Sequence, residues 1–248
     1  MGAALAKAGR TAPGTPAGGE LPHGLPPAAR GRREKLLRIY RLLLSHFGPS
    51  GWWPAESAFE VMVGAILTQN TAWANVERAI ANLKGAGLLS FQGLREVSAR
   101  RLARLIRPAG YFNQKARYLK ELVSHLEAAC GGDLSRFFAR DTAALREEFL
   151  RIKGIGPETA DSILLYAGGH PAFTVDAYTR RSFARLGLIR PRAPYEEIRR
   201  LFQEHLPPSS SLFNEYHALI VRLGKNLCLK SPRCGECPLQ KFGCRTDL

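Results

Sequence analysis

The sequence predicts an all-α protein built as two helical lobes. From Arg33 onward, apolar residues recur at the spacing of amphipathic helices, and glycines and prolines separate the helical stretches. No stretch alternates apolar and polar residues for long enough to indicate a strand. The chain has 248 residues, of which 45% are hydrophobic and 23% charged. It is therefore long enough to bury one large core or two small ones.

The expected helices follow from these apolar stripes. The first two lie in the stretches that carry Leu36, Leu37, Tyr40, Leu43 and Leu44, and then Phe59, Met62, Val63, Ile66 and Leu67. Further helices are expected at 73–84, 98–106, 114–129, 142–152, 157–167, 177–186, 195–205 and 213–227. We expect residues 57–164 to form a six-helix lobe, and residues 33–56 together with 165–248 to form the second lobe.

Residues 1–32 differ in composition from the rest of the chain. They are rich in Ala, Gly and Pro, and Glu20 is their only acid, so they can bury little apolar surface and are expected to be disordered. No apolar segment follows the first basic residues, which argues against a signal peptide. An organelle transit peptide is the alternative to a plain tail. For a bacterial chain, the expected location is the cytoplasm, associated with the nucleoid.

The charge balance favours a polyanionic partner. The chain holds 36 Lys and Arg against 21 Asp and Glu, a formal net charge of +15. Such an excess is typical of proteins that bind nucleic acid or an anionic membrane face. A membrane span is not expected, because the longest apolar run, Val61 to Leu67, is far shorter than the roughly 20 residues that a bilayer helix needs.

A helical hairpin is the most informative local pattern. Asp141 or Thr142 can cap a helix that ends at Gly154, and Pro157 can open the next helix after a very short turn. We expect Gly154 and Gly156 to permit a positive φ and a close approach of another backbone. The unpaired N–H groups at the start of the second helix suit a phosphate. An ordinary turn between two core helices is the alternative interpretation.

Four of the five cysteines lie together near the end of the sequence, and Cys130 stands apart. Their spacing is Cys228-x5-Cys234-x2-Cys237-x6-Cys244. Four thiolates on a short loop suit either an all-cysteine zinc site or a 4Fe-4S cluster, and the spacing alone does not separate the two.

Three segments together resemble the helix-hairpin-helix DNA glycosylase superfamily that includes endonuclease III. They are Phe59-Glu-Val-Met-Val-Gly-Ala-Ile-Leu-Thr-Gln-Asn-Thr71, Lys153-Gly-Ile-Gly-Pro-Glu-Thr-Ala-Asp-Ser-Ile-Leu164, and Phe173-Thr-Val-Asp176. The resemblance implies that the hairpin holds the DNA backbone, through Lys153, Gly154, Ile155, Gly156 and Thr159. It also implies that Asp176 serves catalysis, although a helix N-cap is the commoner role for such a residue. A carboxylate held at a helix N-terminus stays ionised, so both roles are compatible.

The resemblance also favours iron and sulfur for the cysteine loop. Endonuclease III-like glycosylases end in a comparable loop that carries a 4Fe-4S cluster, usually with outer gaps of six and five residues. In this chain those gaps are five and six. Cys228, Cys234, Cys237 and Cys244 are therefore expected to hold a 4Fe-4S cluster, with zinc as the alternative, and basic residues around the loop are expected to face phosphates.

Aromatic residues near the second expected helix resemble the 3-methyladenine branch of the family. Trp52-Trp53-Pro54 and Trp73 are expected to wall the pocket for the flipped base, although large aromatics are often simply core. Gln69 falls where family members insert a side chain into the gap that the flipped base leaves. Capping a turn with Asn70 and Thr71 is its alternative role.

Glu158 stands where the bifunctional enzymes of the family carry a lysine that attacks the sugar. The resemblance therefore implies a monofunctional glycosylase, in which Asp176 activates water. Lys225 is a candidate for a pocket lysine of the alkylation branch, or else for a phosphate contact or a solvated charge. One rival hypothesis is a bifunctional glycosylase and lyase that acts on oxidised pyrimidines, and another is a non-catalytic metal-cluster protein that binds DNA. The expected partner is double-stranded DNA with a damaged base, bound by a monomer in the cleft between the lobes.

Overall fold

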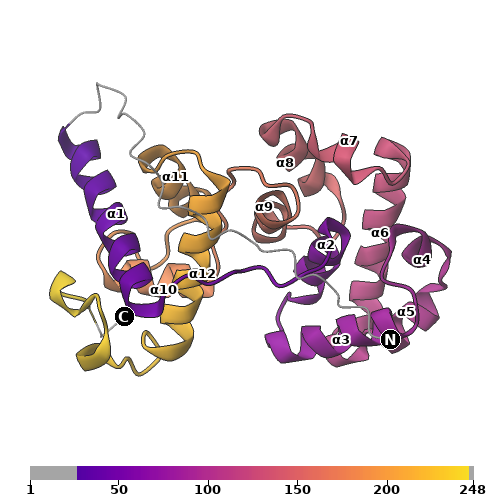
Figure 1. Ribbon diagram of the computed structural model, residues 1–248, viewed down its shortest axis with the longest axis horizontal. Helices are drawn as coiled ribbons and strands as arrows, with labels where there is room; N and C mark the ends of the chain where they lie inside the picture. Colours follow the sequence, from indigo (N-terminus) through magenta and orange to yellow (C-terminus); the bar gives the residue numbers. More distant parts are fainter. Residues whose placement is uncertain (1–26, 246–248) are drawn as a thin grey trace, which may run out of the picture.

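The structure, a computed structural model, describes residues 27–245, and these residues contain helices and no strand (Figure 1). This confirms the predicted all-α class. The α-helices are α1 (Pro27–Phe47), α2 (Ala58–Leu67), α3 (Trp73–Gly85), α4 (Phe91–Glu96), α5 (Ala99–Leu105), α6 (Phe112–Cys130), α7 (Leu134–Phe138), α8 (Thr142–Arg151), α9 (Pro157–Tyr166), α10 (Ala177–Arg185), α11 (Tyr195–His205) and α12 (Ser210–Asn226). Three 3-10 turns complete them: η1 (Arg107–Ala109), η2 (Cys234–Glu236) and η3 (Gln240–Phe242). No helix within residues 27–245 is long and apolar enough to cross a bilayer.

The first helix begins earlier than predicted. Residues 27–32, which we assigned to a disordered tail, are the first turns of α1, and the rest of that tail lies outside the described residues. The physical reason is local. Pro27 suits the first position of a helix, and the alanines and arginines that follow are strong helix formers.

Two short helices were missed. Helices α4 and α7 raise the number of α-helices between residues 57 and 164 to eight, where six were expected. Each spans less than two turns, so neither shows a helical period in the sequence. Their N-caps fix them instead: the side chain of Ser90 accepts a hydrogen bond from Gly93 N, and that of Asp133 accepts one from Arg136 N.

The buried apolar side chains form two separate cores. One core gathers residues of α2 to α9, and the other gathers residues of α1, α10, α11 and α12. Helix α9 lies between the two groups of helices in Figure 1 and contributes to both cores, with Ile163 and Leu164 in the first and Leu165 in the second. The lobes therefore meet along α9.

The hairpin is formed by α8, a short turn and α9. Gly154 has a φ of +94°, and a Cβ added there would lie 2.1 Å from the ring of Tyr118. Only glycine fits this position. Gly156 differs from our expectation, because its φ is −90° and nothing lies within 4 Å of an added Cβ. Its missing side chain leaves the outer surface of the turn open.

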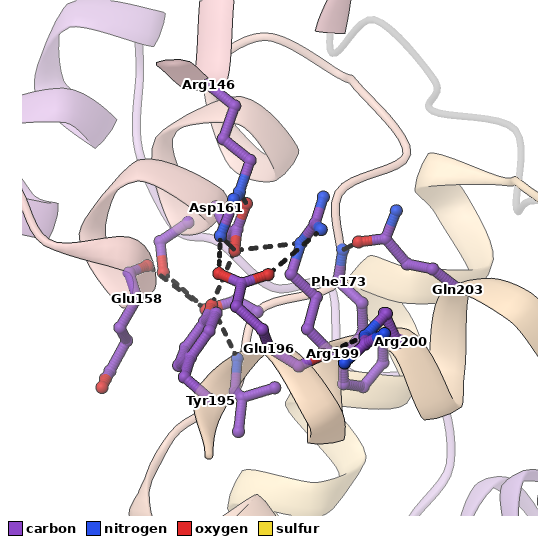
Figure 2. Close-up of polar contacts among 12 residues, drawn as sticks. Arg146, Glu158, Asp161, Phe173, Tyr195, Glu196, Arg199, Arg200 and Gln203 are labelled. Atoms are coloured by element: carbon purple, nitrogen blue, oxygen red, sulfur yellow. Dashed lines mark hydrogen bonds and ion pairs between the residues drawn. The ribbon is translucent and has the colours of Figure 1, made fainter. Parts of the chain in front are cut away.

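A buried ion cluster joins the lobes across α9 (Figure 2). Asp161 in α9 is fully buried, and its carboxylate lies 2.7 Å from Arg146 Nε of α8. On the other side it lies 3.2 Å from Arg199 Nε of α11 and accepts a 2.8 Å hydrogen bond from the Tyr195 hydroxyl. We call Asp161, Arg146, Tyr195 and Arg199 the Asp161 latch. Burial raises the pKa of Asp161, and the two guanidinium groups and the hydroxyl offset that effect only in part, so the pKa stays above its usual value.

Replacing Asp161 with Asn should lower the free energy of unfolding by about 3 kcal/mol, because two largely buried guanidinium groups lose their common counter-charge. Urea unfolding of the purified protein measures this. Glu196→Gln is the matched control, since this carboxylate also contacts Arg146 and Arg199 but is 47% exposed, and its loss should be small. A loss below about 1 kcal/mol for Asp161→Asn would show that the latch is not needed for stability.

Candidate active site

A cleft of about 1220 Å³ is lined by residues of both lobes. Its walls come from the loop before α2, the α2–α3 loop, the hairpin, the start of α10 and one face of α12. The cleft is larger than the roughly 300–1,000 Å³ of small-molecule pockets, so it has room for a base together with part of a backbone. The predicted residues that line it are Trp52, Trp53, Gln69, Trp73, Lys153, Gly154, Ile155, Gly156, Glu158, Thr159, Asp176 and Lys225. Pro54 is exposed and does not line it, which corrects our expectation.

Asp176 caps α10 and faces this cleft. Its Oδ1 accepts hydrogen bonds from Thr179 N at 2.7 Å and from Thr179 Oγ1 at 2.9 Å. Its Oδ2 lies 3.5 Å from His217 Nε2. Burial by itself raises the pKa of Asp176, but His217 and the two donors of Thr179 outweigh burial, and the pKa lies below its usual value. Asp176 is therefore ionised near neutral pH.

The segment before Asp176 is fixed to both lobes. Val175 N donates to the Tyr195 hydroxyl at 3.3 Å, and that hydroxyl in turn donates to Asp161. The hydroxyls of Thr174 and Ser162 lie 3.0 Å apart, and Thr174 Oγ1 also lies 3.4 Å from Glu158 O. Asp176 therefore follows a peptide segment that is hydrogen-bonded to α9 and to α11.

Glu158 lies in the first turn of α9 and lines the same cleft as Asp176. Its side chain is open to the solvent of the cleft. The surrounding walls and the negative charge of Asp176 raise the pKa of Glu158 to about 7, against smaller opposite effects of His217 and Arg180. This position therefore presents a carboxyl group that is close to half protonated at neutral pH, and no amine.

Four aromatic rings pack against one another, and three of them, those of Trp52, Trp53 and Trp73, form one wall of the cleft. Trp73 lies 5.1 Å from Trp52 and 5.1 Å from Trp53, and Trp53 lies 5.1 Å from Tyr166, measured between ring centroids. All three tryptophans are partly exposed, so none is an ordinary core residue. Gly64 of α2 admits the ring of Trp53, which would lie 3.2 Å from an added Cβ.

The loop that carries Trp52 and Trp53 is anchored to α12. Ser50 N donates to Glu215 Oε1 at 2.8 Å, and Ser50 Oγ donates to Glu215 Oε2 at 3.0 Å. The aromatic wall is therefore attached to the same helix that presents His217 to Asp176.

Gln69 contacts the hairpin and not the turn that follows it. Its Nε2 donates to Gly154 O at 2.9 Å and to Thr159 Oγ1 at 3.0 Å. The alternative of a cap with Asn70 and Thr71 is not what the structure shows. Gln69 therefore joins the α2–α3 loop to the turn of the hairpin.

The remaining hairpin residues divide by exposure. Lys153 is exposed, whereas the side chains of Ile155 and Thr159 are buried. Any contact of Ile155 or Thr159 with DNA therefore comes from the backbone. Lys225, near the end of α12, is exposed and lines the cleft from the side opposite the hairpin.

Sequence analysis missed two site residues, Tyr166 and His217. Tyr166 Oη lies 2.5 Å from His217 Nδ1, and His217 Nε2 faces Asp176. A weak pattern pointed to His217, which shares helical spacing with Phe213, Ile220 and Gly224 on the inner face of α12. A polar residue on an apolar stripe is informative only once its partners are known.

The four clustered cysteines line one small cavity of about 20 Å³ beside α10 and α12. Within residues 27–245, no three Cys, His, Asp or Glu side chains converge closely enough to hold a single metal ion. The loop is nevertheless anchored by α10: Arg181 donates to Cys228 O and Gly224 O, and Arg185 donates to Leu229 O and Lys230 O.

The donor set around this cavity fits an anionic sulfur cluster. Arg185 is 4% exposed, and its Nη1 lies 3.4 Å from Cys228 Sγ. The Nε of Arg185 is buried and has no acceptor within the described part of the chain. A buried guanidinium beside four thiols supplies the positive charge that thiolate ligands need.

Comparison with known proteins agrees with this site. The model of the HhH-GPD superfamily of base excision DNA repair proteins matches residues 63–208. A protein of Methanocaldococcus jannaschii that is named, provisionally, as a DNA repair glycosylase is 48% identical over 210 residues, covering 84% of this chain and 96% of its own. Endonuclease III of Sulfolobus acidocaldarius is 28% identical over 188 residues, covering 75% of this chain and 82% of its own.

A solved structure shares the fold as well. The 3-methyladenine DNA glycosylase MagIII of H. pylori, bound to 1,N6-ethenoadenine, superposes with a TM-score of 0.67 and 29% identity, over 78% of this chain and 97% of its own. The family match spans more than half of the chain, and it includes the hairpin and Asp176. The chain therefore belongs to the HhH-GPD superfamily of base excision DNA repair proteins and is a DNA N-glycosylase.

Proposed function

We propose that the protein is a monofunctional glycosylase that hydrolyses alkylated purines, such as 3-methyladenine, from double-stranded DNA. The observation that carries the mechanism is the pairing of an ionised Asp176 with a carboxyl group, and not an amine, at position 158. With no amine there, water is the nucleophile that the site can activate.

The aromatic wall supports the substrate class. A flipped base needs flat surfaces on which to stack, and Trp52, Trp53 and Trp73 supply them from one side of the cleft. An alkylated purine carries a positive charge, so it also gains cation–π attraction from these rings. MagIII, the solved relative, is described as a 3-methyladenine glycosylase.

The chemical step needs little beyond Asp176. The carboxylate stabilises the positive charge that develops on the sugar as the glycosidic bond breaks, and it accepts a proton from the attacking water. The bond electrons pass to the base, which neutralises its charge, and the water oxygen joins the sugar carbon. Because the departing base is already cationic, the site need not supply a strong general acid.

Replacing Asp176 with Asn should lower the rate of base release at least about a hundredfold while duplex binding survives. Asn retains the helix cap, so the fold is preserved. Single-turnover release and fluorescence anisotropy measure the two properties. Asp133→Asn, at the N-cap of α7, is the matched control and should change neither. If Asp176→Asn still released base at the wild-type rate, the proposed mechanism would be wrong. If the wild-type protein itself released no base, the alternative of a non-catalytic DNA-binding protein would gain support.

Borohydride should trap no covalent adduct between the wild-type protein and DNA, whereas Glu158→Lys should form one, because it places an amine beside Asp176. Gel electrophoresis after reduction measures the adduct. An adduct with the wild type would favour the bifunctional alternative. Its loss in Lys225→Met would then identify Lys225, which lines the cleft, as the amine.

We further propose that Cys228, Cys234, Cys237 and Cys244 hold a 4Fe-4S cluster. The cluster would stabilise the basic loop that contains Lys230, Arg233 and Lys241. We propose that the protein, with its formal net charge of +15, binds duplex DNA as a monomer. This loop and the hairpin would then contact the phosphates.

The purified protein should be brown and hold about four irons per chain. Visible absorption and metal analysis measure this. Cys237→Ser should lose both the colour and the iron, and Cys130→Ser should keep them, since Cys130 lies in α6, far along the chain from the loop. A colourless protein with about one zinc per chain would replace the iron-sulfur proposal by the zinc alternative.

A further inference from the structure

We propose that His217, held by Tyr166, is the positioning residue that orients Asp176 and links the aromatic wall of the cleft to the catalytic carboxylate. This inference deepens the proposed function and rests on Asp176 being the group that activates water.

The carboxylate of Asp176 needs a second anchor. Its Oδ1 is already occupied by two donors of Thr179, as expected for a helix N-cap. Its Oδ2 has His217 Nε2 as its neighbour, at 3.5 Å. The N-cap thus fixes one oxygen, and His217 decides where the other oxygen points.

A hydrogen bond from Tyr166 to His217 implies one tautomer of the His217 ring. The Tyr166 hydroxyl lies 2.5 Å from Nδ1 and, among the described residues, makes no other hydrogen bond. If Tyr166 donates to Nδ1, the ring proton must reside on Nε2, which is the nitrogen that faces Asp176. Nε2 is buried, and no residue within 27–245 satisfies it with a well-formed hydrogen bond. A proton on this atom therefore has Asp176 as its natural acceptor.

Tyr166 connects this pair to the base pocket. Its ring lies 5.1 Å from that of Trp53, and Trp53 is confined by Trp73 and by the close approach of Gly64. A base that stacks in the cleft and shifts Trp53 must also press on Tyr166. Through His217, a base bound at the aromatic wall would then change the orientation of the Asp176 carboxylate.

The contact joins three helices, because Tyr166 ends α9, His217 lies in α12 and Asp176 is the N-cap of α10. The other charged groups that face these three residues are Glu158 from α9, Arg180 from α10, and Glu215 and Lys225 from α12. Their effects are common to the wild type and to the variants tested below.

The test measures single-turnover release of 3-methyladenine from methylated duplex DNA as a function of pH. His217→Asn should slow release about tenfold at neutral pH, because Asp176 Oδ2 loses the neighbour that orients it. Because His217 lowers the pKa of Asp176, its removal raises that pKa, and Asp176 becomes protonated at higher pH. The ratio of variant to wild-type rate should therefore fall further as the pH drops from about 7 to about 5.

Tyr166→Phe keeps the ring against Trp53 but removes the hydroxyl, so it should change the rate in the same direction by a smaller factor. The double variant should match His217→Asn alone, because Tyr166 acts only through His217. Tyr216→Phe is the matched control. It removes a buried tyrosine hydroxyl from α12, the helix of His217, and that hydroxyl donates to Leu36 O in α1. This variant should leave the pH profile unchanged.

The outcomes separate this inference from the proposed function. If the wild type releases no alkylated purine, or Asp176→Asn remains active, the proposed function fails. If Asp176 is essential but the ratio of variant to wild-type rate does not change with pH for His217→Asn and Tyr166→Phe, the positioning role alone is overturned. Duplex affinity and unfolding midpoint, measured for each variant, exclude a general loss of fold.

Discussion

The buried carboxylate of Asp161 is the contact on which the geometry of the cleft depends. The two cores are separate, and α9 is the element they share, so the lobes need a fixed relation across that helix. The Asp161 latch supplies it by binding α8 and α11 to α9 at one point. Its Tyr195 also holds the peptide before Asp176. A buried charge is costly, and here its partners set the distance between the hairpin and Asp176.

Helix α10 connects the cleft with the cysteine loop near the end of the chain. Its first turn holds Asp176 at the cleft, and its last two turns present Arg181 and Arg185 to the cysteine loop. Gly224 of α12 lets the ring of Tyr178 approach closely, since an added Cβ would lie 2.3 Å from that ring. Disorder of the cysteine loop would thus release both α10 and α12, the helices that carry Asp176 and His217. The proposed cluster would then support the positions of Asp176 and His217 by keeping this loop ordered.

Local patterns predicted what local forces determine. The long helices, the hairpin and the N-cap position of Asp176 follow from apolar spacing and turn residues, and the cysteine spacing revealed the loop. Contacts between distant residues were not predictable. Tyr166 and His217 are 51 positions apart, and Asp161 and Tyr195 are 34 apart, so neither pair leaves a pattern in one sequence. Gly156 gives another example, because the sequence does not tell a glycine that needs a positive φ, such as Gly154, from an exposed glycine with an ordinary φ.

The central claim is that this cleft removes alkylated purines by hydrolysis. The most direct measurement is base release by the wild-type protein from two matched duplexes, one carrying 3-methyladenine and the other thymine glycol, under identical conditions. We predict release of 3-methyladenine, leaving an intact strand with an abasic site, and no release of thymine glycol. Release of thymine glycol with strand cleavage, and no release of 3-methyladenine, would contradict the claim. It would mean that the tryptophan wall does not select the base and that an amine elsewhere in the cleft attacks the sugar.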